Sequence, residues 1–231
     1  MTIYNTFGKL LCFGYSLANA AWKIEGEALT PDPAVYVVHH QNMFGPVHTI
    51  GLLPKEAHMW SLHCFVDKKK TFDQYYNYTF LVRYGWSKPI SYVVAKVLSI
   101  VVPLTLRSLR VIPVYHDATS VKTMRDSLDV LGKGESIVIC PDVDYASTSP
   151  FIGKMYPGFF MLGRSYCKRT NTELPFIPLY CSKTLKKIVV GPAYHLDCDA
   201  PYNDARDDLE NQLASWINQQ AVECGDHLLE V

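Results

Sequence analysis

A histidine at the end of an apolar segment is the residue of this sequence best placed to do chemistry. Residues 35–38 are continuously apolar, and His39 and His40 follow them directly. A histidine that leaves a strand at a loop can act as a general base near neutral pH. It performs that role best when a carboxylate fixes its tautomer and stabilises its cation. His40 is the candidate base. Side chains of consecutive strand residues point to opposite faces, so we expect His39 to be structural.

Two further polar groups come directly after apolar segments. His116 follows residues 111–115, and Asp142 follows residues 136–140. Because the carboxyl ends of parallel strands meet at one edge of a sheet, where α/β proteins bind their ligands, we expect both side chains to lie near His40. Asp142 is the candidate carboxylate for His40. The other acidic candidates are Asp117 and Asp144, which are also suited to capping helices.

The elements that position these residues follow from the spacing of apolar side chains. Strands are predicted over residues 34–39, 111–115, 136–140, 176–180 and 187–190. Helices are predicted from about residue 117 to 131 and from residue 203 or 204 onward. Pro113 cannot donate to a sheet, so its strand is expected to be weak, to lie at an edge or to end there. Strands that alternate with amphipathic helices predict a single α/β domain with a mostly parallel central sheet flanked by helices.

Two segments could contact lipid. Residues 1–23 are predicted to form an amphipathic helix that either docks on the core or attaches to a membrane, and residues 24–231 form the α/β domain. Within it, residues 60–109 form an insert rich in aromatic and apolar side chains. This insert suits membrane or acyl-chain contact, or packing over the sheet. Lys96 and Pro103 interrupt its apolar stretch, which favours a buried, interfacial or re-entrant helix over a bilayer span.

Composition excludes several classes of function. The chain has 22 basic and 22 acidic side chains, so no overall field recruits nucleic acid. Its seven cysteines form no Cys-x-x-Cys pair, which argues against a disulfide framework and against a zinc site. We expect no bound metal and a reducing, cytoplasmic setting.

Four short blocks, in this order and spacing, resemble those of the glycerolipid and lysophospholipid acyltransferase superfamily. The family's Asn-His-x4-Asp block is similar to residues 39–45. Its Ile-Pro-Val-x-Arg strand is similar to residues 112–116, and its Phe-Pro-Glu-Gly block to residues 140–143. Its proline-centred hydrophobic strand is similar to residues 175–180.

The resemblance implies a glycerolphosphate acyltransferase-like fold and acyl transfer. His40 would take a proton from an acceptor hydroxyl, which attacks an acyl thioester carried by coenzyme A or acyl carrier protein as co-substrate, with no other cofactor. The acceptor would be a lysophospholipid, another membrane lipid, or a different hydroxyl or amine compound. The protein would be attached peripherally or monotopically to a membrane. The residues expected to bind substrate are His116, Gln41, Asn42, Lys154 and Arg164.

The sequence departs from the family pattern at its functional positions. The aspartate of the first block is Gly45, the arginine of the second is His116, and the glutamate of the third is Asp142. Loss of the carboxylate from a His–Asp pair costs about 10⁴ in rate in a serine protease. Three interpretations stay open. The chain is an active enzyme in which Asp142, or another aspartate, replaces the lost carboxylate. It is an inactive lipid-binding or partner-binding protein. Or it shares only the architecture.

Overall fold

The computed structural model describes residues 4–29, 33–53, 56–115 and 120–229. Its strands are β1 (Lys23–Gly26), β2 (Val35–Val38), β3 (Ala57–Leu62), β4 (Ile112–Val114), β5 (Ser136–Ile139), β6 (Pro175–Ser182), β7 (Lys187–Val190) and β8 (Tyr194–His195). Its α-helices are α1 (Thr6–Ala18), α2 (Phe44–Leu52), α3 (Lys68–Asp73), α4 (Lys88–Ser108), α5 (Ser120–Leu131), α6 (Met161–Thr170) and α7 (Tyr202–Glu223). A π-helix, η2 (Gln74–Arg83), and the short 3-10 helices η1 (His63–Val66), η3 (Pro157–Phe160) and η4 (Asp226–Leu229) complete the described elements.

The strands form one mixed sheet in the order β1-β7-β6-β2-β5-β3-β4, and β8 pairs with β6. Strand pairs β2–β5, β2–β6, β3–β5, β3–β4 and β1–β7 are parallel, whereas β7 and β8 run antiparallel to β6. The predicted α/β class with a mostly parallel sheet is confirmed. The edge position expected from Pro113 is confirmed too, since β4 is the last strand of the order.

Strand β2 lies at the centre of the sheet. Val35 pairs with Ile137 of β5 on one side and with Phe176 of β6 on the other. All of its residues are fully buried, as a continuously apolar strand covered on both faces should be. The loop after β2, which carries His39 and His40, therefore starts from a fully buried strand that is paired on both sides.

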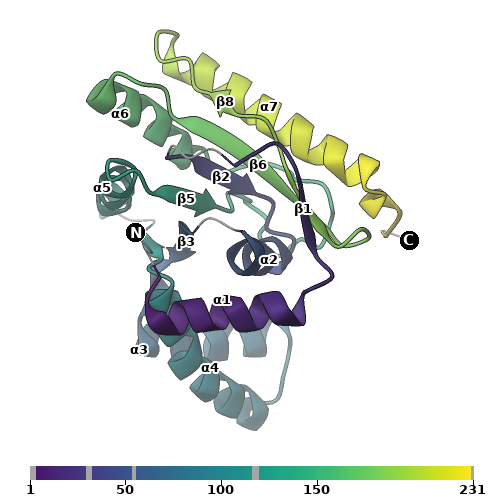
Figure 1. Cartoon of the computed structure of the whole chain (residues 1–231). Coiled ribbons are helices and arrows are strands. Elements are labelled where there is room, and N and C mark those ends of the chain that lie inside the picture. Colours follow the sequence, from purple (N-terminus) through teal and green to yellow (C-terminus); the bar gives the residue numbers. More distant parts are fainter. Residues whose placement is uncertain (1–3, 30–32, 54–55, 116–119, 230–231) are drawn as a thin grey trace.

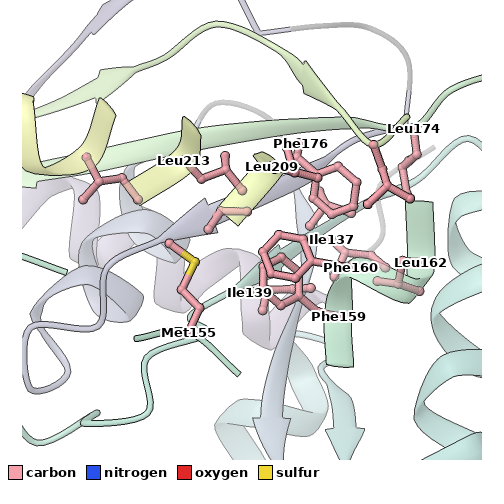
Figure 2. Close-up of a cluster of buried hydrophobic side chains, with 14 of the residues drawn as sticks. Ile137, Ile139, Met155, Phe159, Phe160, Leu162, Leu174, Phe176, Leu209 and Leu213 are labelled. Atoms are coloured by element: carbon pink, nitrogen blue, oxygen red, sulfur yellow. The ribbon is translucent and has the colours of Figure 1, made fainter. Parts of the chain in front are cut away.

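Helices cover both faces of the sheet. On one face, Ile137 and Phe176 pack against Leu162 of α6 and against Leu209 and Leu213 of α7 (Figure 2). On the other face, Tyr36, Val138 and Ile177 form a second buried cluster, on which Phe44 and Ile50 of α2 pack. This second layer brings the start of α2 against the end of β2.

A third group of helices lies farther from the sheet. Helix α4 contacts α1, α3 and η2, and Figure 1 shows α1, α3 and α4 together on the side of the molecule away from α7. The aromatic rings of the insert pack largely on one another, and the rings of Phe80 and Trp86 stack with centroids 4.6 Å apart. Helix α4 continues through Pro103 rather than stopping there.

Gly45 is packed too tightly to carry a side chain. It lies in the first turn of α2, and its N–H donates to the carbonyl oxygen of His40 at 3.1 Å. A Cβ atom added to Gly45 would lie 2.0 Å from the carbonyl oxygen of His39. The main chain at the end of β2 therefore occupies the space that an aspartate at this position would need.

We predict that Gly45→Ala and Gly45→Asp each lower the free energy of unfolding by about 1–3 kcal/mol, because the added atoms must displace the His39 carbonyl. Urea denaturation followed by circular dichroism measures the loss. Gly158→Ala is the matched control, since a Cβ atom on Gly158 meets nothing within 4 Å. A Gly45→Asp variant as stable as the wild type would show that an aspartate fits here after all.

Candidate active site

The carboxyl ends of β2 and β5 meet at a small cavity. His39 and His40 follow β2, and Asp142 lies three residues beyond the last residue of β5. The cavity has a volume of about 150 Å³ and is lined by His39, Asp142, Asp144, Ser147, Phe151, Gly153 and Lys154. The edge of the sheet where the sequence predicted a site is thus the edge where polar side chains converge on a hollow.

Asp142 holds the two histidines in place. Asp142 is 5% exposed, and one oxygen of its carboxylate, Oδ1, contacts Nδ1 of the His39 ring. The other oxygen, Oδ2, accepts the main-chain N–H of His40 at 2.9 Å. Asp142 also forms an antiparallel bridge with Met155, which anchors the loop on which it sits. One buried carboxylate therefore joins the end of β2 to the segment after β5.

The structure places the Asp142 carboxylate on the ring of His39, whereas the sequence predicted it on the ring of His40. The second ring nitrogen of His39, Nε2, lies 2.8 Å from the carbonyl oxygen of Ser149. A carbonyl only accepts, so Nε2 of His39 carries a hydrogen. Both nitrogens of this buried ring are engaged, and His39 is a structural link between β2, Asp142 and the loop at Ser149.

The ring of the partly buried His40 is bonded differently from that of His39. Its Nδ1 accepts the main-chain N–H of Met43 at 3.1 Å, so the neutral ring carries its hydrogen on Nε2. Within the described residues no hydrogen-bond partner of Nε2 is found. The ring also packs edge-on against Tyr145, with centroids 5.9 Å apart. With respect to the described residues, Nε2 of His40 is therefore a free hydrogen-bond donor.

The surroundings of His40 lower its pKa and so favour the neutral ring. Burial is the largest influence and lowers the pKa of His40; the neighbouring His39 and the cation of Arg83 lower it further, while the carboxylate of Asp142 opposes them. A neutral imidazole at pH 7 is the form that a base or a neutral donor requires.

The turn between β2 and α2 is strained. Gln41, Asn42 and Met43 have φ angles of 43°, 51° and 76°, a left-handed run without glycine. The left-handed conformation costs roughly 1–2 kcal/mol per residue, and such strain clusters at functional sites. The buried side chain of Gln41 donates to the carbonyl of Cys181 at 3.4 Å. Gln41 therefore anchors the turn, although the sequence placed it among the residues that bind substrate.

Arg83 is a residue of this site that sequence reasoning missed. It is the last residue of η2, and its guanidinium donates to Oδ1 of Asn42 at 3.2 Å. The same group lies over the ring of Tyr84, 5.4 Å from its centroid. A signal was present, because Arg83 is the only basic residue between Lys70 and Lys88. Nothing in the sequence indicated which residue it would meet.

The remaining predicted residues are not all brought together. Lys154 lines the cavity beside His39. Arg164 donates to the carbonyls of Cys198 and Ala200 at 2.8 and 2.7 Å, and the structure does not bring it to this cluster. His116 lies outside the described residues, as does Asp117. Among the described residues no group of three or more histidine, cysteine or acidic side chains is arranged to hold a metal ion.

We predict that His40 titrates below the ordinary histidine value of about 6.5. Arg83→Gln should raise this pKa, because a cation that disfavours the imidazolium is removed, and Asp142→Asn should lower it. Histidine-selective NMR titration measures the midpoint, with His40→Gln assigning the resonance. Arg125→Gln, which removes an exposed cation from α5, is the control. An unchanged midpoint in Arg83→Gln would contradict the proximity of Arg83 to His40.

Comparison with known proteins supports the fold. No protein-family model matches the sequence, and no curated protein matches it. Among solved structures, the chain is similar to the crystal structure of the 1-acyl-sn-glycerophosphate (LPA) acyltransferase PlsC from Thermotoga maritima. The TM-score is 0.56 and the sequence identity 10%, over 92% of this chain and 80% of that one. The predicted acyltransferase-like α/β fold is confirmed by this similarity.

Proposed function

We propose that this chain is a membrane-attached acyl-transfer enzyme. It would move a fatty acyl group from acyl-CoA or acyl carrier protein to a lysophospholipid or another hydroxyl or amine acceptor. One observation carries the proposal: a buried carboxylate, Asp142, holds the main chain of His40 at the carboxyl edge of the sheet, while the bond from Met43 to Nδ1 of His40 leaves the ring hydrogen on Nε2. The acyltransferase-like fold and the matching order of the sequence blocks support it.

Acyl transfer requires one proton to leave the acyl acceptor and one proton to reach the thiolate that departs. The acceptor oxygen attacks the thioester carbonyl carbon, the C–S bond breaks, and the proton lost by the acceptor passes to the departing thiolate. In the described conformation Nε2–H of His40 suits the carbonyl oxygen, on which negative charge develops. The lone pair of His40 lies on Nδ1 and faces the N–H of Met43. For His40 to take the acceptor's proton, the strained turn at residues 41–43 must release that contact.

A second function, binding of an acyl chain or lipid without transfer, is favoured by one specific observation. Both nitrogens of His39 and the lone pair of His40 are engaged inside the protein. If the turn never releases Met43, the site retains a fold that holds lipid but contains no base at these two histidines.

A transfer assay separates the two functions. With a long-chain acyl-CoA and lysophosphatidate in mixed vesicles, we predict that His40→Gln lowers the rate of thiol release by about 10²- to 10⁴-fold, the usual contribution of a general acid or base. His195→Gln, which replaces an exposed histidine on β8, is the control. Equal rates for His40→Gln and the wild type would remove the enzymatic proposal. Acyl chains recovered from both proteins by extraction and mass spectrometry would then support binding alone.

The proposal of membrane attachment rests on helix α4. An ordinary surface helix buries its large apolar side chains, whereas α4 buries small residues and exposes several large apolar ones. Its small residues Ser91, Ala95 and Ser99 are buried against the protein. Six of its large apolar residues are each at least half exposed: Ile90, Val93, Val97, Ile100, Val101 and Leu104. A contiguous exposed apolar surface of this kind is typical of membrane or partner contact.

Helix α1 adds a second exposed apolar surface next to α4. Leu10, Phe13 and Leu17 are 65%, 60% and 62% exposed. The two helices touch where Gly8 approaches Ser108, since a Cβ atom on Gly8 would lie 2.6 Å from the Ser108 carbonyl oxygen. Amphipathic helices with such faces lie in the plane of a bilayer surface.

Helix α4 is long and apolar enough to cross a membrane by length and composition. A parallel orientation fits its surroundings better, because α3 and η2 pack along it and the exposed Lys68–Lys70 begin α3. A crossing helix would draw those lysines toward lipid, whereas an interfacial helix leaves them at the headgroups. We therefore propose monotopic or peripheral attachment to the cytoplasmic surface.

Vesicle flotation tests the attachment. We predict that Val97→Glu combined with Leu104→Glu weakens partition into vesicles containing anionic lipid by at least about 100-fold, since two buried apolar side chains contribute together about 3 kcal/mol or more. Val121→Glu on α5 is the control, because Val121 is 73% exposed on a different helix. Flotation of the double variant at the wild-type level would refute lipid contact through α4.

A further inference from the structure

Three segments far apart in the sequence converge beside His40. The turn after β2 contributes His40 and Asn42, the end of η2 contributes Arg83, and the loop after β5 contributes Tyr145. The sequence blocks that suggested acyl transfer include neither Arg83 nor Tyr145. Their position next to the free donor of His40 calls for a separate explanation.

Arg83 is a partly buried cation. No ion pair between Arg83 and an acidic side chain is found in the part of the chain that the structure describes. Its hydrogen bond to a described residue goes to the neutral amide of Asn42, and its guanidinium lies over the ring of Tyr84. A guanidinium has five N–H donors in a rigid fork, so most of those of Arg83 remain available.

The surrounding residues fix the direction of Arg83. It ends a π-helix, a rare element that occurs often at functional sites, and Gly85 follows with a φ of 63°. On the other side, Asn42 is held in a left-handed turn, which aims its amide oxygen at the guanidinium. Order on both sides means that the fork of Arg83 is set in place before any ligand arrives.

The unused polar groups of Arg83 and His40 are all N–H hydrogen-bond donors. Arg83 offers N–H groups and a positive charge, and His40 offers Nε2–H from a neutral ring. The guanidinium of Arg83 cannot accept a hydrogen bond, and the acceptor nitrogen of His40, Nδ1, is already used by the N–H of Met43. Such a pair matches an oxygen-rich anion, and the fork geometry of arginine matches phosphate oxygens.

We propose that Arg83, with His40 and supported by Asn42, forms a subsite for a phosphoryl group of a substrate. The inference deepens the proposed acyl transfer and rests on it, because it names the anionic part of a substrate of that reaction. It also supplies a cation that the resemblance lacked, since His116 stands where the family has arginine.

The phosphoryl group could belong to either substrate. A lysophospholipid carries it in its headgroup, and coenzyme A carries it in its pyrophosphate and ribose phosphate. The position of Arg83 at the end of η2, which packs against α4, places the subsite between the proposed membrane helix and the sheet edge. Both substrates would approach from that side.

Equilibrium binding to one probe at a time tests the subsite without any turnover. The probes are lysophosphatidate below its critical micelle concentration, monoacylglycerol of the same chain length, and coenzyme A. We expect Arg83→Gln to weaken the binding of one of the two phosphoryl probes by about 10- to 100-fold, which is the contribution of a hydrogen bond to a charged group. Monoacylglycerol, which has no phosphate, should bind both proteins equally. Arg83→Lys, which keeps the charge but loses the fork, should be intermediate, and Arg125→Gln should match the wild type.

The binding results show which substrate supplies the phosphoryl group, and they separate failure of the subsite proposal from failure of the acyl-transfer proposal. Weakened lysophosphatidate binding with unchanged coenzyme A binding assigns the subsite to the acceptor headgroup, and the reverse assigns it to the donor. Both results support the proposal, even if the protein shows no transferase activity. Unchanged binding of both phosphoryl probes in Arg83→Gln overturns it. Loss of monoacylglycerol binding in the same variant also overturns it, since the effect would then be structural.

Discussion

The contact of Asp142 with the two residues that directly follow β2 is the constraint on which the candidate site depends. One oxygen contacts the His39 ring, and the other accepts the main-chain N–H of His40. A single carboxylate therefore fixes both the His39 side chain and the path of the main chain at His40. The carbonyl of Ser149 closes the same arrangement from a second loop. Breaking a buried charged contact of this kind typically costs about 3–5 kcal/mol, because the remaining partner is left unsatisfied.

This constraint also explains why the chain carries glycine where a carboxylate was expected. The carboxylate reaches the end of β2 from the β5 side, through Asp142, so none is needed from α2. Gly45 then lets α2 begin directly against the carbonyl of His39. The two features belong together: a side chain at position 45 would push the His39 carbonyl away and disturb the ring that Asp142 holds.

Most of the sheet could be predicted from the sequence because its strands are short runs of valine, isoleucine and neighbouring apolar residues. Strand β3 was missed because it begins with Ala57 and His58, and the buried polar ring of His58 is satisfied by the Arg110 carbonyl and by Glu135. Those partners are distant in the sequence, so nothing local marked His58 as a strand residue. Helix α2 was missed because the left-handed turn before it contains no glycine, and glycine is the usual signal for such a turn.

The site was predictable in its location but not in its pairing. The ends of the predicted strands indicated that His40 and Asp142 would lie close together. Which ring Asp142 contacts depends on how the chain leaves β2, and that is decided by packing. The same limit applies to α4 and Arg83. An apolar run has the same sequence whether it faces the core or lipid, and only the burial of its small residues shows that the large ones point outward. Arg83 then stands where this outward-facing layer meets the sheet edge, so the one charged group of η2 lies between a surface suited to lipid chains and a ring suited to their chemistry.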